Sequence, residues 1–110
     1  AGLAPGVYDF PGWPKVKISP GDAARDYEHH WLSGSAITMD EAVRRSRRVL
    51  GCSLADACFM ASATIADLLG RDGEIGRIAP GLRADLVVLD DDASVRMTLV
   101  AGEIAWQKGH

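Results

Sequence analysis

The sequence predicts an α/β chain, because three stretches of different character follow one another. Residues 1–35 are rich in glycine and proline, which prevent helices and favour loops with short strands. The middle of the chain carries apolar side chains at helical spacing. From Gly76 onward the pattern changes to short β-rich runs. The expected order is therefore loop, helices and then strands, without internal repeats or low-complexity segments.

Length and composition exclude several classes of protein. The chain has 110 residues, whereas a complete (β/α)₈ barrel needs about 250. Its net charge of -3 argues against a nucleic-acid partner. No apolar run approaches the roughly 20 residues that span a bilayer, and residues 1–10 lack the charged and apolar segments of a signal peptide. We therefore expect no membrane partner and a cytoplasmic location.

The first third of the chain should contain a small hairpin that faces solvent. Residues 15–19 alternate polar and apolar side chains, Pro20 and Gly21 form a turn signal, and residues 22–27 can return as the partner strand.

A first helix is predicted from about Met39 to Leu50, ending at Gly51. Thr38 and Glu41 have the spacing of a capping box, in which Thr38 caps the helix and Glu41 reaches back to it. An apolar stripe along this helix should pack inward. The remaining positions are mostly basic and should face water: Arg44, Arg45, Arg47 and Arg48.

A second helix should follow Ser53, which forms another capping pair with Asp56. Its residues are apolar nearly all round, so we expect it to be buried on most sides, with Cys52 and Cys58 as buried thiols. A short helical stretch is expected over residues 64–69. Three strands should then follow: residues 86–89, 95–100 and 104–106, with the acidic residues 90–92 in a solvated turn.

Few residues of this chain carry obvious chemistry. His29 and His30 are adjacent, so on a strand they would point to opposite faces, and His110 is the last residue. No metal-binding motif is present, and we expect neither a catalytic residue nor a metal ligand here. The most specific local feature is a loop of small residues, Leu32 to Ser35, before the first helix. Gly34 lets a ligand approach the backbone closely.

Several segments together resemble N-acetylglucosamine-6-phosphate deacetylases, which are members of the amidohydrolase superfamily. Residues 32–43, LSGSAITMDEAV, resemble the family pattern L-[AS]-G-S-x-L-T-M-x-x-A-V. Residues 76–87 resemble the G-x-I-x-x-G-x-x-A-D-L-V segment that ends many amidohydrolases, and residues 100–102 resemble their final V-x-G turn. The opening AGLAPGVY is similar to the loop after the last barrel strand. One departure is Ile65, where the family commonly has proline.

The resemblance implies the C-terminal part of a metal-dependent (β/α)₈ amidohydrolase barrel, namely its last βα loop and helix, plus strands of a small β-sandwich. Residues 1–75 would end the barrel domain and residues 76–110 would belong to the sandwich. In the family a divalent metal of the zinc or iron type activates water, and an aspartate that would lie before Ala1 acts as general base. Leu32, Ser33 and Gly34 would contact the amino sugar phosphate. The implied partners are the remainder of the same chain and a second copy in a homodimer.

Two alternatives stay open. The tail motif is shared with other amidohydrolases, such as dihydroorotase-like or imidazolonepropionase-like enzymes. Alternatively, the chain is a non-catalytic α+β interaction module that folds by itself. The apolar run at residues 86–89 needs cover on both faces, which favours a portion of a larger enzyme that is inactive alone.

Overall fold

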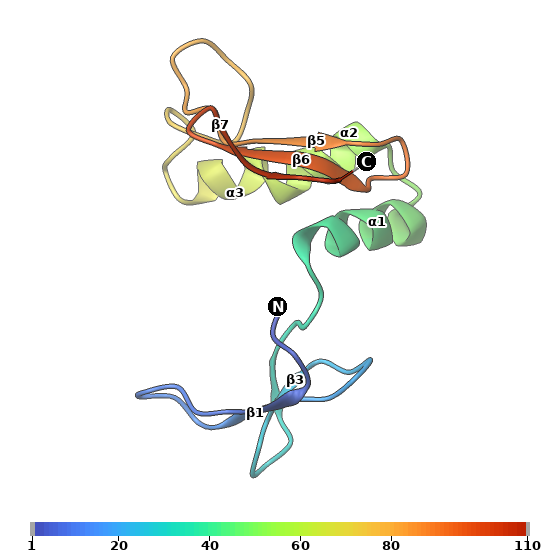
Figure 1. Cartoon of the computed structure of the whole chain (residues 1–110), viewed down its shortest axis with the longest axis vertical. Coiled ribbons are helices and arrows are strands. Elements are labelled where there is room, and N and C mark those ends of the chain that lie inside the picture. Colours follow the sequence, from blue (N-terminus) through green and yellow to red (C-terminus); the bar gives the residue numbers. More distant parts are fainter. Residues whose placement is uncertain (1, 110) are drawn as a thin grey trace. The chain divides into compact units, whose positions relative to one another are not determined.

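The computed structural model describes residues 2–109, and their contacts form two compact units that divide between residues 38 and 39 (Figure 1). This division follows contacts within the chain, so the domain boundary expected after residue 75 stays a prediction. Between residues 2 and 109, none of the helices combines the length and the apolar character that crossing a membrane requires.

The first unit is a four-stranded antiparallel sheet in the order β1-β2-β3-β4. Its strands are β1 (Gly6–Tyr8), β2 (Val16–Ile18), β3 (Ala24–Asp26) and β4 (Leu32–Gly34). The predicted hairpin is confirmed, because β2 pairs with β3 and Gly21 adopts a φ of 71° in the turn between them. Strands β1 and β4 are additional. Each has only three residues, which is too short to show a clear alternating pattern.

The helices of the second unit are α1 (Met39–Leu50), α2 (Leu54–Ala61) and α3 (Ala63–Leu68). The bounds of α1 agree with the prediction, and Gly51 ends it with a φ of 65°. The predicted cap of α2 is also confirmed: the Asp56 amide donates to Ser53 Oγ at 3.1 Å, and the Ser53 amide donates to the Asp56 carboxylate at 3.3 Å.

Side chains of helix α1 make contacts that differ from those predicted. Glu41 does not reach back to Thr38, because its carboxylate accepts hydrogen bonds from Arg44 at 3.0 Å and Arg45 at 2.7 Å. Not all of the arginines face water, since Arg44 also donates to the backbone carbonyl of Ala93 at 3.2 Å. Arg47 likewise donates to the carbonyl of Asp91 at 3.0 Å. Helix α1 is therefore tied to the acidic turn, which is not simply solvated.

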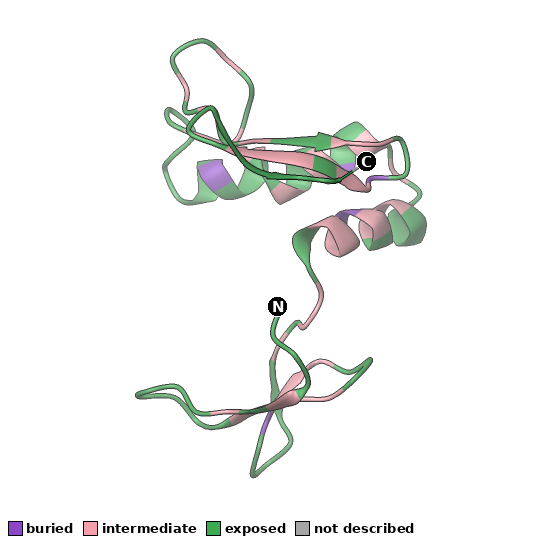
Figure 2. Ribbon diagram, viewed as in Figure 1, coloured by how far each residue is buried: buried purple, intermediate pink, exposed green. Residues whose placement is uncertain are grey.

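The core of the second unit is small. Val43, Ala57 and Ala93 form it, with Cys52 and Cys58 packed against its side. Both thiols are half-buried, so the prediction that they are buried is wrong. The prediction of a mostly buried α2 is also wrong: Figure 2 shows this helix largely exposed or half-buried, with Ala57 as its buried residue.

The three predicted C-terminal strands are confirmed as an antiparallel sheet in the order β5-β6-β7. They are β5 (Leu86–Leu89), β6 (Val95–Val100) and β7 (Glu103–Gln107). Ala101 and Gly102 have φ values of 52° and 86°, which fit a two-residue hairpin turn of type I′. The Ala101 amide donates to the carboxylate of Asp85 at 2.9 Å, and the Gly102 amide donates to the carbonyl of Ala84 at 2.9 Å. Through these two hydrogen bonds the motif at residues 76–87 binds the turn that follows Val100.

The close contact between Gly76 and helix α3 can be tested by substitution. A Cβ at this position would lie 2.5 Å from the Cβ of Ala66, and its φ is 94°. We therefore expect Gly76→Ala to lower the free energy of unfolding by about 1–3 kcal/mol, because the added methyl overpacks a tight contact in a strained conformation. Denaturant unfolding measures this.

The matched control is Gly73→Ala in the same loop, where a Cβ meets nothing within 4 Å and φ is ordinary. It should change stability by no more than about 0.5 kcal/mol. Equal effects of the two substitutions would contradict the assigned contact.

Candidate functional site

The predicted site residues Leu32, Ser33 and Gly34 form strand β4, at the edge of the first sheet, instead of the loop expected from their small side chains. Gly34 lies opposite Ala24 and Leu32 lies opposite Arg25, so Ser33 is an extra residue between the two pairs. This arrangement is a β-bulge, which commonly redirects a side chain next to a functional site. Leu32 is 69% exposed and Ser33 is also exposed. Both are accessible to a ligand.

The space around Gly34 is open. A Cβ built at this position meets nothing within 4 Å, and its φ lies outside the left-handed region. Neither packing among the described residues nor backbone conformation therefore requires a glycine here. The open space suits a ligand that approaches the backbone closely.

The turn that leads into β4 is organised by Asp26, which is 8% exposed. One of its carboxylate oxygens, Oδ1, accepts the backbone N–H of His29 at 2.6 Å and that of Glu28 at 3.1 Å. The same oxygen lies 3.0 Å from His29 Nδ1, which must donate, since an ionised carboxylate only accepts. His29 and His30 lie in this turn and not on a strand.

Two aromatic rings stack beside the carboxylate. The rings of His29 and Trp31 are 4.7 Å apart between centroids, with an interplanar angle of 24°. Trp31 is 71% exposed, so most of this residue is accessible to solvent. Neither Asp26 nor Trp31 stands out in the sequence as a candidate site residue. The available signal was the aspartate itself, because aspartate side chains commonly accept hydrogen bonds from backbone amides in turns.

The pKa of Asp26 lies below its usual value. The backbone N–H of His29 contributes most to this shift, because it stabilises the ionised carboxylate, while burial opposes it. The sequence separates Asp26 from Leu32 by only a short turn, so this charge lies in the same hairpin as the candidate site.

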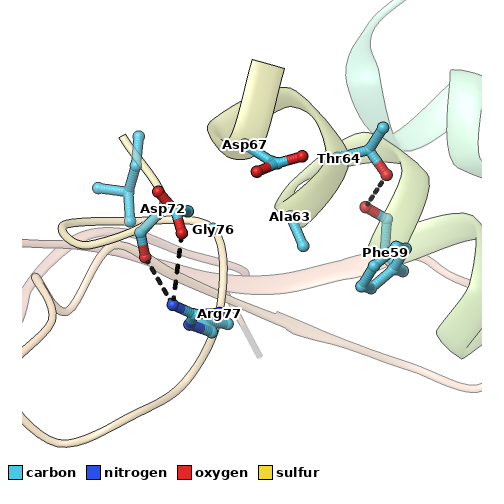
Figure 3. A pocket seen from close by; sticks show the side chains of 8 residues that line it. Phe59, Ala63, Thr64, Asp67, Asp72, Gly76 and Arg77 are labelled. Atoms are coloured by element: carbon cyan, nitrogen blue, oxygen red, sulfur yellow. Dashed lines mark hydrogen bonds and ion pairs between the residues drawn. The ribbon is translucent and has the colours of Figure 1, made fainter. Parts of the chain in front are cut away.

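A hollow of about 340 Å³ lies in the second unit, beside α2 and α3 (Figure 3). Two of its polar side chains bind neighbouring carbonyls: Arg77 donates to the carbonyl of Asp72 at 3.0 Å, and Thr64 donates to the carbonyl of Phe59 at 3.3 Å. None of the predicted site residues lines it.

Within residues 2–109, no group of three or more histidine, cysteine, aspartate or glutamate side chains could hold a metal ion.

The Asp26 contacts predict a pH dependence. Because the pKa of Asp26 is lowered in the folded turn, the carboxylate stabilises this turn above its ordinary pKa near 3.8. That contribution should be lost as pH falls through the lower, folded value. We expect the amide resonances of Glu28 and His29 to shift together below about pH 4 in a ¹⁵N NMR titration.

Asp26→Asn is the matched control for this titration, because its side chain keeps an acceptor oxygen and has no carboxyl proton to gain. The shared transition should be absent in this variant. A transition that persists there would show that another group causes it.

The chain is similar to known proteins along most of its length. The chain matches the amidohydrolase family over residues 22–105. It is 45% identical over 76 residues to the N-acetylglucosamine-6-phosphate deacetylase of Bos taurus, which covers 69% of this chain and 19% of that protein. It is 39% identical over 90 residues to the N-acetylgalactosamine-6-phosphate deacetylase of Shewanella sp. (strain ANA-3), covering 82% of this chain and 22% of that protein.

A solved structure, the N-acetylglucosamine-6-phosphate deacetylase of Thermotoga maritima, superimposes with a TM-score of 0.79 and 38% sequence identity. The alignment covers 98% of this chain and 29% of that protein. The chain thus spans about a fifth of the length of the curated relatives it matches. These comparisons confirm the resemblance read from residues 32–43 and 76–87, and the chain belongs to the amidohydrolase family.

Proposed function

We propose that this chain is the C-terminal portion of an N-acetylglucosamine-6-phosphate deacetylase. The whole enzyme would hydrolyse the N-acetyl group of N-acetylglucosamine 6-phosphate to give glucosamine 6-phosphate and acetate. The observation that carries this proposal is the likeness to the Thermotoga maritima deacetylase, at 38% identity over 98% of this chain. Because the matched bovine and Shewanella relatives also bear deacetylase names, we favour this activity over that of a dihydroorotase-like or imidazolonepropionase-like enzyme.

We assign each element to its place in the whole enzyme from the amidohydrolase family resemblance. Residues 1–75 end a (β/α)₈ barrel, in which β4 belongs to the loop after the last barrel strand and α1 is the last barrel helix. Residues 76–110 supply β5, β6 and β7 to a small β-sandwich. The family match supports this assignment, because its range, residues 22–105, includes most of both parts.

Leu32, Ser33 and Gly34 are the proposed substrate-binding residues. As an edge strand, β4 has one side without a pairing strand among the described residues, so backbone N–H and C=O groups there are available to a ligand. The Ser33 hydroxyl, at the bulge, can donate and accept hydrogen bonds. Hydroxyl and acetamide groups of an amino sugar are complementary to such a strand, and Gly34 leaves room for the sugar to approach.

Amidohydrolases are generally metal-dependent, and the divalent metal of this enzyme, of the zinc or iron type, would be held by residues outside this chain. The proposed role of the chain is to bind and orient the sugar at β4. A homodimer and a cytoplasmic location stay predictions.

N-acetylgalactosamine 6-phosphate is the second candidate substrate. The Shewanella relative named for it aligns with more of this chain than the bovine relative does, 82% against 69%. The two sugars differ only in the orientation of one ring hydroxyl, so a small change in hydrogen bonding can separate them.

The decisive experiment measures acetate release by the full-length protein that contains this chain, with each of the two sugar phosphates. We expect turnover with N-acetylglucosamine 6-phosphate and a lower kcat/KM with its galactose epimer. The isolated chain, supplied with zinc, should show no turnover, because the proposed metal ligands and general base lie outside it.

Two outcomes would contradict this proposal. One is a full-length protein that is inactive on both sugars. The other is an isolated chain whose turnover matches that of intact enzymes.

Gly34→Ala tests the proposed contact at β4. Because a Cβ here meets nothing within 4 Å in this chain, the substitution should leave the melting temperature unchanged. In the full-length enzyme it should raise KM about tenfold if the sugar occupies that space. Gly109→Ala is the control, since its Cβ also meets nothing within 4 Å. An unchanged KM in Gly34→Ala would remove Gly34 from the site.

A further inference from the structure

Asp26 has no role in the chemistry proposed so far, yet among residues 2–38 it alone is buried. A buried carboxylate needs several hydrogen bonds to offset its lost hydration. Its position at the end of β3, directly before the turn into β4, makes those bonds relevant to the site.

The contacts of Asp26 involve every residue of the segment 28–31. Its carboxylate accepts the amides of Glu28 and His29, and it also binds the His29 ring. Its backbone carbonyl accepts the amide of His30 at 3.0 Å, and its own amide donates to the carbonyl of Trp31 at 2.8 Å. His30 is held at a φ of 59°, a conformation that residues other than glycine rarely adopt.

The bulge at Ser33 explains why the turn 28–31 needs these hydrogen bonds. Ser33 interrupts the ladder between β3 and β4, so only two residue pairs set the alignment of these strands. A shift of one residue would turn each side chain of β4 to the opposite face of the sheet. A backbone hydrogen bond from the Asp26 amide to the Trp31 carbonyl lies immediately before Leu32, and the Asp26 carboxylate holds the amides of Glu28 and His29 in the turn that this bond closes.

We propose that Asp26 is a positioning residue for the substrate. It holds the turn 28–31 so that β4 presents Leu32 and Ser33 to the amino sugar in one register. This inference rests on the proposed function and adds to it a residue that does not itself contact the sugar.

Asp22 provides a matched control within the same sheet. Its carboxylate also caps a turn next to β3, accepting the Ala23 amide at 2.8 Å, and it pairs with Arg25 at 2.9 Å. This turn joins β3 to β2, at the end of β3 away from the turn 28–31. Arg25, the partner of Asp22, also donates to the His30 carbonyl at 3.3 Å, so this variant weakens the support of one bond to the turn 28–31 while leaving every contact of Asp26 in place. Loss of Asp22 therefore tests general weakening of the sheet with the Asp26 contacts intact.

The experiment compares Asp26→Ala, Asp26→Asn and Asp22→Ala in the full-length enzyme, by steady-state kinetics with N-acetylglucosamine 6-phosphate and by thermal unfolding. Asp26→Ala should raise KM about tenfold with kcat within about twofold of the wild type, since binding is lost equally in the ground and transition states. Asp26→Asn should recover much of the affinity because its amide oxygen still accepts the two backbone amides. Asp22→Ala should keep the wild-type KM.

A purely structural role gives a different result. It lowers the active fraction and so the apparent kcat, while KM stays at the wild-type value. That outcome, or an equal rise of KM in Asp22→Ala and Asp26→Ala, overturns the proposal. If Asp26→Ala does not fold, Asp26→Asn decides: a modestly raised KM supports the proposal and a wild-type KM overturns it. A wild-type enzyme with no turnover overturns the proposed function itself, which is a distinct result.

Discussion

Hydrogen bonds from backbone amides to aspartate carboxylates hold the turns of this chain. Asp26 accepts from the turn before β4, Asp85 accepts from Ala101 between β6 and β7, and Asp92 accepts from Ser94 at 2.9 Å between β5 and β6. The pKa of each of these carboxyls is lowered: at Asp26 and Asp92 a backbone amide contributes most, whereas at Asp85 the Arg83 side chain contributes most and the Ala101 amide comes second. The turns depend on these contacts because the buried apolar residues, Val43 and three alanines, form too small a core to fix them.

The small core also explains the exposed apolar surface. Many large apolar side chains are more than 40% exposed, on both β strands and helices of the described chain. A monomer rarely exposes so much apolar surface without a partner for it. The proposed place of the chain in a larger amidohydrolase accounts for this, because the chain aligns with only 19% of the bovine relative and 29% of the Thermotoga maritima enzyme. The interaction module that folds by itself is correspondingly the weaker hypothesis.

Elements with strong local signals could be predicted from the sequence. The bounds of α1, the cap of α2 and the hairpin between β2 and β3 follow from capping residues, helical spacing and turn signals. Contacts between distant segments could not be predicted in this way. Arg44 and Arg47 bind carbonyls of the turn before β6, which no local pattern reveals, and α2 lacks the cover that its composition suggested. The proposed site residues come from the family resemblance alone, because the strand that carries them is too short to show a period.

A substrate strand must meet two opposing requirements, exposure to the ligand and a fixed position. Burial would fix the strand but would hide it, and β4 is largely exposed. Hydrogen bonds to an ionised carboxylate resolve this conflict, because Asp26, the one buried residue among residues 2–38, is placed in the neighbouring strand and acts through the turn. The bulge at Ser33 then frees part of β4 from pairing, while Asp26 keeps the alignment that the bulge would otherwise weaken. Accessibility and register are thus set by different residues of one hairpin.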